Sequence, residues 1–490
     1  MIRPLLSRYW GCAQPMRAPL ALVCVLAIAA GDRSGAADLP ALGDGSSAIV
    51  SPAAERELAR AALMQIRAGA PTVEDPILKY YVRLNVFRLA EKSDLTEAAL
   101  NTVLIDSPQI NAFAVPGGIV GINLGLFLHA QDESEYSSVV AHELAHLSQR
   151  HYARGIEQQR AMTPLMLAGL LASVIIAAAG GGEAGMAAAA STQALIADQG
   201  LRFSRSREQE ADRIGLNTLV NAGLDPDGMG RMFERMQRAY RFVDRPPEFL
   251  LTHPLTESRI SDAKDQAERF EDKTVAPALD YQLMRVRAQT RYAQSARRAL
   301  AEATARSGRS TVDKYAIALA LARDGQHENA ADAARLLHRD HPESLLMTAS
   351  FAEILTDAGR TDEAIGLLTR ELAINPDNEP LTYLYAEALN AAERHGDAAD
   401  VLWRHTRVNP DDVDVWELLA ETEGLAGNTV AVHRARAEYF ARVGAFRMSI
   451  QHLDYARRLV HDGERRLLAR LDQRIIDLRT ELEARQELEN

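Results

Sequence analysis

The 490-residue sequence predicts a mainly α-helical protein, in which a helical unit with a small β-hairpin or sheet precedes an α-solenoid of repeats. Three observations support this fold class. Apolar residues recur at helical spacing along most of the chain, only two runs have β-strand character, and the C-terminal part repeats every 34 residues. The length exceeds what one hydrophobic core usually serves, so two or three folded units are expected.

Composition narrows the class of protein. The chain is 47% hydrophobic and 25% charged, which is typical of a soluble globular protein and excludes a polytopic membrane protein or a disordered chain. Its formal net charge of -12 disfavours broad electrostatic binding of nucleic acid. Only two cysteines occur, Cys12 and Cys24, so a disulfide scaffold and a cysteine-based zinc module are excluded.

Residues 1–37 have the organisation of a cleavable signal peptide. Arginines precede an apolar run from Leu20 to Ala30, and small residues follow it before Ala37. The run is too short to span a bilayer comfortably. We expect its removal and export to an oxidising compartment, with an uncleaved N-terminal anchor as the alternative. Cleavage would remove both cysteines.

Residues 38–275 are predicted to form the first folded unit. Two signals mark the start of its central helix, because Asp132 can cap that helix and Glu135 follows three residues later. We expect helices over 76–92, over 132–154 with Gly155 as a stop, and from about 204 to before Gly223, with strand-like runs over 102–106 and 112–122, the second broken at 116–118.

Residues 276–490 are predicted to form the solenoid. Three rows of residues are spaced by 34 or 68 positions: Pro342, Pro376 and Pro410; Gly325, Gly359 and Gly427; Ala330, Ala364 and Ala398. This is the tetratricopeptide period, in which a turn glycine separates two helices, a small alanine allows close packing and a proline follows the second helix.

One unit departs from the repeat pattern. Glu393 occupies the glycine position of the third unit and Gly396 follows three residues later, which predicts an altered turn. Helices around 281–304 and 430–460 are expected to extend the array, and the charged helix over 464–490 could cap it.

A metal-site motif lies in the helix predicted over 132–154. His142 and His146 are separated by four residues and share one helix face, so both imidazoles can bind one zinc ion. Glu143 faces the same region and could take a proton from a water that attacks a peptide carbonyl. The alternative is a pair of exposed histidines beside a solvated glutamate.

The identity of the third protein ligand of the zinc ion distinguishes the classes of zinc protease. A metzincin would need a glycine and a histidine where this chain has Gln149 and Tyr152. His151 follows His142 by nine residues, which predicts that it lies on the opposite side of the helix.

A second helix offers a carboxylate ligand. Glu208 and Asp212 are four residues apart on one face, whereas Glu210 is about 200° round from Glu208. We choose Glu208 as the ligand and Asp212 as the carboxylate that orients a histidine ligand or helps to handle protons. By itself this segment would be an ordinary salt-bridged surface helix.

These motifs resemble a known protease family. The segments His142–His146, Glu208–Asp212, Leu251–Leu255 and Ser258–Arg259 are similar to those of the gluzincin proteases related to HtpX and Oma. With a signal peptide and C-terminal tetratricopeptide repeats, the layout is similar to the BepA-like periplasmic protease and chaperone branch of that family.

The resemblance implies one Zn²⁺ per chain. It implies Glu143 as the catalytic base and Asp212 as a supporting acid, with metal ligands His142, His146 and Glu208.

The resemblance also gives roles to two loops. His253 can occupy the fourth coordination position of the metal and hold the enzyme latent, although the residues alone favour a structural loop histidine beside Pro254. A segment beside the cleft is implied to be an edge strand to which an extended substrate adds: Asn111, Ala112, Phe113 and Ala114. A plain hairpin is the alternative for that segment.

The segment from Met162 to Gly182 is almost wholly apolar and long enough to span a bilayer. A single crossing would separate His142 and His146 from Glu208, which contradicts the zinc site. We therefore expect burial against the protease core or a flap over the cleft, with peripheral membrane contact as the alternative.

Together these features predict an exported zinc metalloendopeptidase whose repeats recruit polypeptide clients or an assembly machine. The resemblance implies a quality-control role in a Gram-negative periplasm, with misassembled outer-membrane β-barrel proteins as clients and their assembly machinery as partner. The alternative is a chaperone or scaffold of outer-membrane assembly with a latent or largely structural zinc site.

Overall fold

The computed structural model of the chain describes residues 51–96, 99–152, 205–241, 248–270, 275, 277–305, 310–461 and 463–489. The predicted signal peptide and the apolar segment from Met162 to Gly182 lie outside these residues, so both interpretations stay predictions. Among the described helices, none combines the length and the apolar character needed to cross a membrane.

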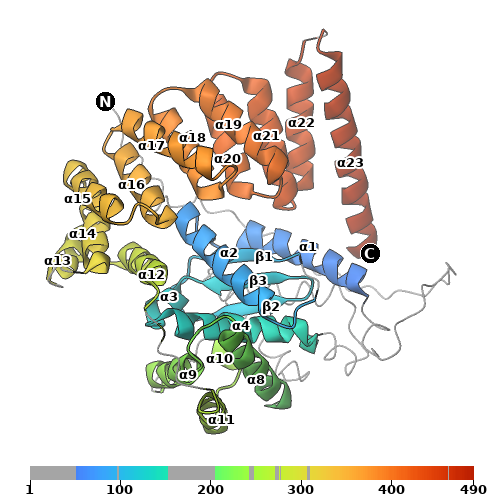
Figure 1. Cartoon of the computed structure of the whole chain (residues 1–490). Coiled ribbons are helices and arrows are strands. Elements are labelled where there is room, and N and C mark those ends of the chain that lie inside the picture. The colour runs from blue at the N-terminus through green and yellow to red at the C-terminus, as the bar shows by residue number, and fades with distance from the viewer. Residues whose placement is uncertain are drawn as a thin grey trace, which may run out of the picture.

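The N-terminal part is a small sheet enclosed by helices, which confirms the predicted mainly α fold (Figure 1). Ser51 caps the first helix and Asp75 the second, and each is followed by a proline in the first turn. The elements are α1 (Pro52–Gly69), α2 (Pro76–Glu91), β1 (Asn101–Ile105), β2 (Ala112–Val115), β3 (Ile119–Asn123), α3 (Gly125–His129), α4 (Glu133–Ser148), α8 (Arg205–Asn221), α9 (Asp227–Tyr240), α10 (Glu248–Thr252) and α11 (Glu257–Ala267).

The three strands form one sheet in the order β1-β3-β2. Strand β3 is parallel to β1 and antiparallel to β2, and β2 lies at an edge of the described sheet. The residues predicted to break the second strand form the turn between β2 and β3, where Gly117 and Gly118 have φ of 86° and 98°. A Cβ on Gly117 would lie 2.3 Å from the backbone oxygen of Glu55, so this turn packs directly on α1.

The two faces of the sheet pack on different helices. One face packs on α1 through a core that includes Ile66, Ile105 and Ile119. The other face packs on α2 and α4, which belong to the largest core of the molecule. The metal-motif helix α4 is therefore anchored against the same sheet whose edge is β2.

The C-terminal part is the predicted array of paired helices. The alanines that repeat every 34 residues, Ala330, Ala364 and Ala398, are fully buried where paired helices meet. The helices are α12 (Leu279–Tyr292), α13 (Ala296–Ala305), α14 (Thr311–Arg323), α15 (His327–Asp340), α16 (Leu345–Asp357), α17 (Thr361–Ile374), α18 (Glu379–Ala391), α19 (His395–Val408), α20 (Val413–Leu425), α21 (Thr429–Arg442), α22 (Phe446–Leu459) and α23 (Arg465–Glu489).

The prediction of an altered turn at Glu393 is wrong. Glu393 has a φ of 61°, and its N–H donates to the carbonyl three residues earlier, while the next N–H donates five residues back. The same bonds form at Gly325, Gly359 and Gly427, whose φ values are 79°, 73° and 79°. The helix-ending turn is therefore kept, and a glutamate adopts the left-handed backbone that glycine adopts elsewhere.

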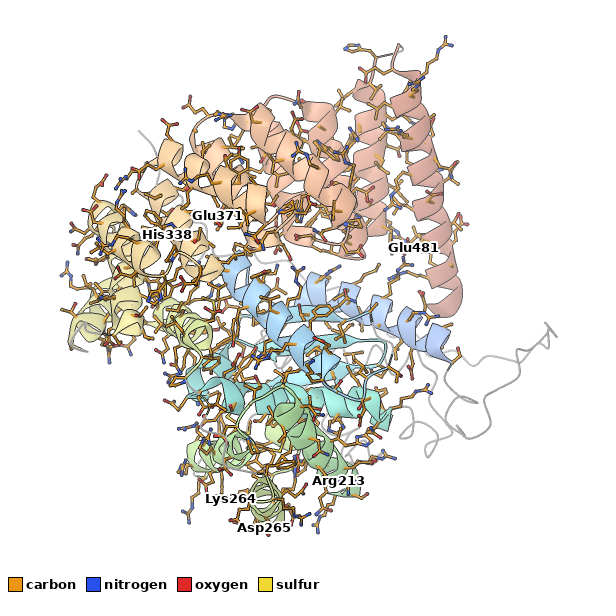
Figure 2. All side chains as sticks on the ribbon, in the orientation of Figure 1. Arg213, Lys264, Asp265, His338, Glu371 and Glu481 are labelled. Atoms are coloured by element: carbon orange, nitrogen blue, oxygen red, sulfur yellow. The ribbon has the colours of Figure 1, made fainter. Side chains whose placement is uncertain are left out.

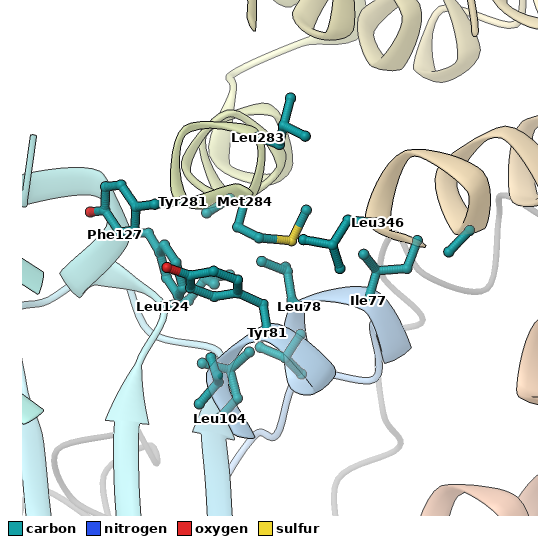
Figure 3. Close-up of a cluster of buried hydrophobic side chains, with 14 of the residues drawn as sticks. Ile77, Leu78, Tyr81, Leu104, Leu124, Phe127, Tyr281, Leu283, Met284 and Leu346 are labelled. Atoms are coloured by element: carbon teal, nitrogen blue, oxygen red, sulfur yellow. The ribbon is translucent and has the colours of Figure 1, made fainter. Parts of the chain in front are cut away.

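Helix α12 joins the two parts of the molecule. Tyr281 from α12 is fully buried against Phe127 and Tyr136 of the N-terminal part, and its hydroxyl donates to the carbonyl of Ala130 at 2.9 Å. Figure 3 shows Met284 of the same helix directed toward α2 and Leu346 of the repeats, whereas Leu283 points away from α2. One hydrophobic core thus runs from the sheet into the first repeats.

A buried ion network strengthens this junction. Arg287 of α12 donates to Asp75 at the start of α2 at 2.5 Å and to Glu353 of α16 at 2.7 Å. Burial opposes a charge on this guanidinium, but the two carboxylates outweigh it and raise the pKa of Arg287 well above its ordinary value. Removing the arginine would leave two buried carboxylates without their cation.

The far end of the N-terminal part is remote from the repeats. Figure 2 shows Arg213 of α8 and Lys264 of α11 at the opposite end of the molecule from His338, Glu371 and Glu481 of the repeat helices. Helices α1 and α2 lie between these two ends (Figure 1). The metal-motif helices α4 and α8 therefore lie at the end of the N-terminal part away from the solenoid (Figure 1).

Replacing Glu393 by glycine tests the strained turn. Because a left-handed backbone is costly for a residue with a Cβ, we expect Glu393→Gly to raise the free energy of unfolding by about 0.5–1 kcal/mol in urea denaturation. The matched control is Gly359→Ala, where an added Cβ would meet nothing within 4 Å, so that only the backbone changes. This variant should lose about 1 kcal/mol. Lower stability of Glu393→Gly would contradict the assignment of strain.

Candidate metal centre

Helix α4 begins at the predicted cap and ends earlier than predicted. The Asp132 carboxylate accepts from the N–H of Glu135 at 2.8 Å, and the buried Glu135 carboxylate pairs with Arg235 at 2.8 Å. The helix stops at Ser148 and not at residue 154, because Arg150 turns the chain with a φ of 48°. The predicted stop at Gly155 lies outside the described residues.

Helix α8 packs closely on α4. A Cβ on Gly215 would lie 3.1 Å from the backbone nitrogen of His142, which is tighter than ordinary contact. Ala141 and Ala211 are fully buried in the same region of the two helices. Small residues therefore let the carboxylates of α8 approach the histidines of α4.

Four predicted ligands converge on one point. The Nε2 atoms of His142 and His146 are 3.0 Å apart, and the Glu208 carboxylate lies 3.5 Å and 3.4 Å from them. His253 Nδ1 lies 3.1 Å from Glu208 Oε2. All four residues are buried, and one ligand atom from each lies within 4.8 Å of the others. Buried imidazole and carboxylate donors at this spacing fit a divalent metal ion.

Glu143 is directed toward the same point from α4. Its Oε1 lies 3.6 Å from His253 Nε2 and has no hydrogen-bond partner among the described residues, although the side chain is 2% exposed. Burial raises the pKa of Glu143, and the nearby His253 and His142 only partly oppose this. A buried carboxylate with a raised pKa and an unused oxygen can accept a proton from a reacting group.

Asp212 and Arg259 surround the ligands with charge. Asp212 Oδ1 lies 2.9 Å from His142 Nδ1, as expected of a carboxylate that orients a histidine ligand. Arg259 of α11 donates to both Asp212 oxygens at 2.7 Å and lies 3.0 Å from Glu208. It also donates to the carbonyl of Pro254 at 2.9 Å. One guanidinium therefore holds both acids and the loop that carries His253.

The carboxylates make the site favour positive charge. Burial opposes protonation of His142, but the hydrogen bonds to Asp212 and Glu208 outweigh it and raise the pKa of His142 to about 10. Burial also opposes ionisation of Glu208, but His253 and His142 hold the pKa of Glu208 well below its ordinary value. A divalent cation would supply the positive charge that these buried acids attract.

His151 lies beside His146, so its predicted position on the opposite side of the helix is wrong. Because α4 ends at Ser148, residue 151 does not continue the helical spacing on which that prediction depended. The His151 Nδ1 atom lies 2.9 Å from His146 Nδ1, and His151 Nε2 lies 3.0 Å from Glu210 Oε2.

The predicted edge strand lies beside Glu143, the predicted catalytic base. The backbone of Ala114 lies close enough to the Glu143 carboxylate to oppose the rise of its pKa, and Ala112 is buried in the core that α4 shares. Phe113 points to the other face, where its ring covers Gly121 of β3 and packs on the α1 core. Asn111 is 6% exposed, and its carbonyl accepts from Asn123 of β3. Of these four residues, Ala114 is the one placed at the metal centre.

Sequence reasoning assigned no role to Arg259, His151 and Glu210. Arg259 had one signal, because it belongs to the motif segment that follows His253. Glu210 lies between Glu208 and Asp212 in the sequence. Because it is about 200° round the helix from Glu208, the spacing indicated no role for it at the metal. His151 was excluded by extending the helix through a turn that the sequence did not reveal.

Loss of Arg259 should destabilise the metal-free site. In Arg259→Met, Glu208 and Asp212 would stay buried without the guanidinium that pairs with both of them, so we expect the free energy of unfolding to fall by about 3–5 kcal/mol in urea. The control is Arg231→Met, because the Arg231 side chain is 37% exposed beside Asp225 and its loss should cost less than about 1 kcal/mol. Equal losses would contradict a special role for Arg259.

Comparisons with known proteins agree with this geometry. The model of Peptidase family M48 matches residues 76–267, and a tetratricopeptide repeat model matches residues 355–422. The first match contains the predicted ligands and the second lies within the repeats.

Several curated relatives share most of the chain. The Beta-barrel assembly-enhancing proteases of Yersinia pestis and Escherichia coli K12 are each 32% identical to it, over 90% of this chain and 91% of theirs. A relative from Vibrio cholerae is 37% identical over 56% of each chain. The Mitochondrial metalloendopeptidase OMA1 of Schizosaccharomyces pombe is 32% identical over 37% of this chain and 50% of its own.

The first two relatives span nearly all of this chain, and the family match covers the helices that bring the histidines and acids together. The chain therefore belongs to the beta-barrel assembly-enhancing protease family of M48 peptidases, and it is a metalloendopeptidase that carries tetratricopeptide repeats.

Proposed function

We propose that this chain is a zinc endopeptidase of the periplasm that hydrolyses misfolded or misassembled outer-membrane β-barrel proteins. The observation that carries the proposal is the buried group of His142, His146, Glu208 and His253 beside Glu143. The names of two relatives, which refer to enhanced β-barrel assembly, support the class of client. Residues 1–37 are the proposed signal peptide, 38–275 the peptidase unit and 276–490 the repeat unit.

The proposed chemistry assigns one task to each side chain. His142, His146 and Glu208 hold zinc, which when bound supplies Lewis-acid polarisation of the scissile carbonyl. Glu143 accepts the proton of the attacking water and passes it to the leaving amine, and burial, which raises its pKa, makes it a stronger proton acceptor. Asp212 fixes the ring of His142 through the contact at Nδ1.

His253 makes this site latent in the proposal. Its ring lies between the ligand group and the base, with Nδ1 3.1 Å from Glu208 and Nε2 3.6 Å from Glu143. A catalytic zinc site keeps one coordination position for water or substrate, and His253 would fill that position. Activity then requires the loop between α10 and α11 to move His253 away.

The proposed substrate site is the edge that β2 forms in the described sheet. An extended client could add there as a further strand, with Asn111 to Ala114 as its template. The backbone of Ala114 lies beside the Glu143 carboxylate, so a strand added at this edge would run past the proposed catalytic base.

The proposed role of the repeats is recruitment. Tetratricopeptide arrays present long helical surfaces that bind other proteins. We propose that this array binds polypeptide clients or the outer-membrane β-barrel assembly machinery, with support from the relatives' names and the repeat match.

One observation favours a second function, that of a chaperone or scaffold with a structural zinc site. Structural zinc sites are closed by four protein ligands, and His253 completes such a set. The two functions differ in what happens when His253 is removed.

Replacing the proposed base Glu143 should abolish cleavage and leave zinc binding unchanged. We expect Glu143→Gln to bind zinc as wild type does but to lose at least about a hundredfold in cleavage of an unfolded client, because the amide cannot accept the proton. Zinc per chain and client cleavage are measured in parallel. Glu268→Gln, at an exposed position after α11, is the matched control and should leave both unchanged. Cleavage that persists in Glu143→Gln would refute its assignment as the base.

Removal of the His253 side chain distinguishes a latent catalytic zinc site from a structural zinc site. Under the proposal, His253→Ala keeps one zinc per chain and cleaves an unfolded client several-fold faster than wild type, because a coordination position opens. Zinc content and initial cleavage rates are measured, with His461→Ala at an exposed position as control. An unchanged or lower rate would instead favour the chaperone or scaffold.

A further inference from the structure

The second ring nitrogen of His146 faces a side chain to which the proposed chemistry gives no task. While Nε2 of His146 faces His142 and Glu208, its Nδ1 lies 2.9 Å from His151 Nδ1. His151 is fully buried, and its Nε2 lies 3.0 Å from a carboxylate oxygen of Glu210. The three side chains form a continuous series of hydrogen-bonding contacts that starts at the ligand group and ends at a carboxylate.

The contacts define which nitrogen carries each proton. If His146 binds metal through Nε2, its Nδ1 must carry the hydrogen and donate it to His151 Nδ1. His151 Nδ1 then accepts, so its hydrogen lies on Nε2 and is donated to Glu210. The negative charge of Glu210 thereby strengthens His151 as an acceptor, and His151 in turn strengthens His146 as a ligand.

Helix α8 supplies an acid to each ligand of α4. Glu208 faces the ligand group itself, and Asp212 contacts His142 Nδ1 directly at 2.9 Å. Glu210 extends from another side of α8 and reaches His146 through His151. His142 and His146 therefore each have a supporting carboxylate, one by direct contact and one through a second imidazole.

The end of α4 is built so that His151 can make this contact. The left-handed backbone at Arg150, with φ of 48°, is unfavourable for a residue that has a Cβ. The Arg150 guanidinium donates to Glu55 of α1 at 2.8 Å and 3.2 Å, and both side chains are largely buried. This ion pair stabilises the turn that brings His151 back onto His146.

We propose that His151 and Glu210 are positioning residues that fix the tautomer and the ring orientation of His146 as a metal ligand. This inference rests on the proposed zinc site. Loss of a hydrogen-bonding partner behind a metal ligand typically costs 10- to 100-fold in metal affinity. We expect about tenfold weaker zinc binding in Glu210→Gln, which keeps an acceptor oxygen but loses the charge, and up to about a hundredfold in His151→Phe.

The test compares metal affinity in full-length variants. Zinc dissociation constants are measured by competition with a chelator, and the visible absorption of each Co²⁺-loaded protein reports the ligand field. The comparison set is wild type, Glu210→Gln, His151→Phe, the direct-ligand variant Glu208→Gln and the exposed charge-loss control Glu268→Gln. A changed Co²⁺ spectrum at saturating metal, with an unchanged melting temperature of the metal-free protein, identifies positioning and not general destabilisation.

The outcomes separate this inference from the function on which it rests. Weaker zinc binding and a shifted Co²⁺ spectrum in Glu210→Gln, with Glu268→Gln like wild type, support it. Wild-type affinity and spectrum in Glu210→Gln, while Glu208→Gln loses zinc, overturn the inference and leave the zinc site standing. If Glu208→Gln also keeps wild-type affinity, the proposed site itself fails. Should His151→Phe not fold, Glu210→Gln decides alone, because Glu210 is 31% exposed.

Discussion

The close approach of α4 and α8 is the constraint on which the metal centre depends. Gly215 permits it, because a side chain there would press on the backbone of His142 at 3.1 Å. At this separation the short side chain of Asp212 reaches His142 Nδ1 at 2.9 Å, and Glu208 reaches the Nε2 atoms of both histidines. A wider spacing would separate both buried acids from the histidines and leave Arg259 to pair with each of them.

Because α4 and α8 pack closely, their charged side chains need counter-charges nearby, and other residues of the site supply them. Several acids and imidazoles share a region from which water is largely excluded, so each charge needs a counter-charge at short range. Arg259 supplies one from α11, and its bond to the Pro254 carbonyl joins charge compensation to the position of the His253 loop. The electrostatics of the ligands and the geometry of the loop are therefore not independent.

The ligand group could be predicted from the sequence because local geometry determines it. Four residues separate His142 from His146 and Glu208 from Asp212, and any regular helix places such pairs on one face. That these two helices meet was inferred from the need for a third zinc ligand. The place of His253 at the site came from family resemblance, since no spacing within one helix encodes its contact with Glu208 across 45 residues.

What the sequence did not predict involves backbone turns and contacts distant in the chain. His151 was placed by assuming that α4 continues, whereas Arg150 takes a left-handed conformation that is uncommon for arginine. The turn at Glu393 could not be predicted for the same reason, because its hydrogen bonds form although the residue is not a glycine. Arg287 and Tyr281 bind the repeats to the first part through partners up to 212 residues away, beyond the reach of periodicity.

Helix α12 has a consequence for the choice of cleavage site. Because it is buried in the core of the first part and in that of the first repeats, the array cannot swing about a flexible linker without breaking one continuous hydrophobic core. The distance from the first repeats to Glu143 is then set by the fold. Under the proposed function, a polypeptide anchored on these repeats would be cut at a set length from its anchor, so that the enzyme would select by spacing as well as by local sequence.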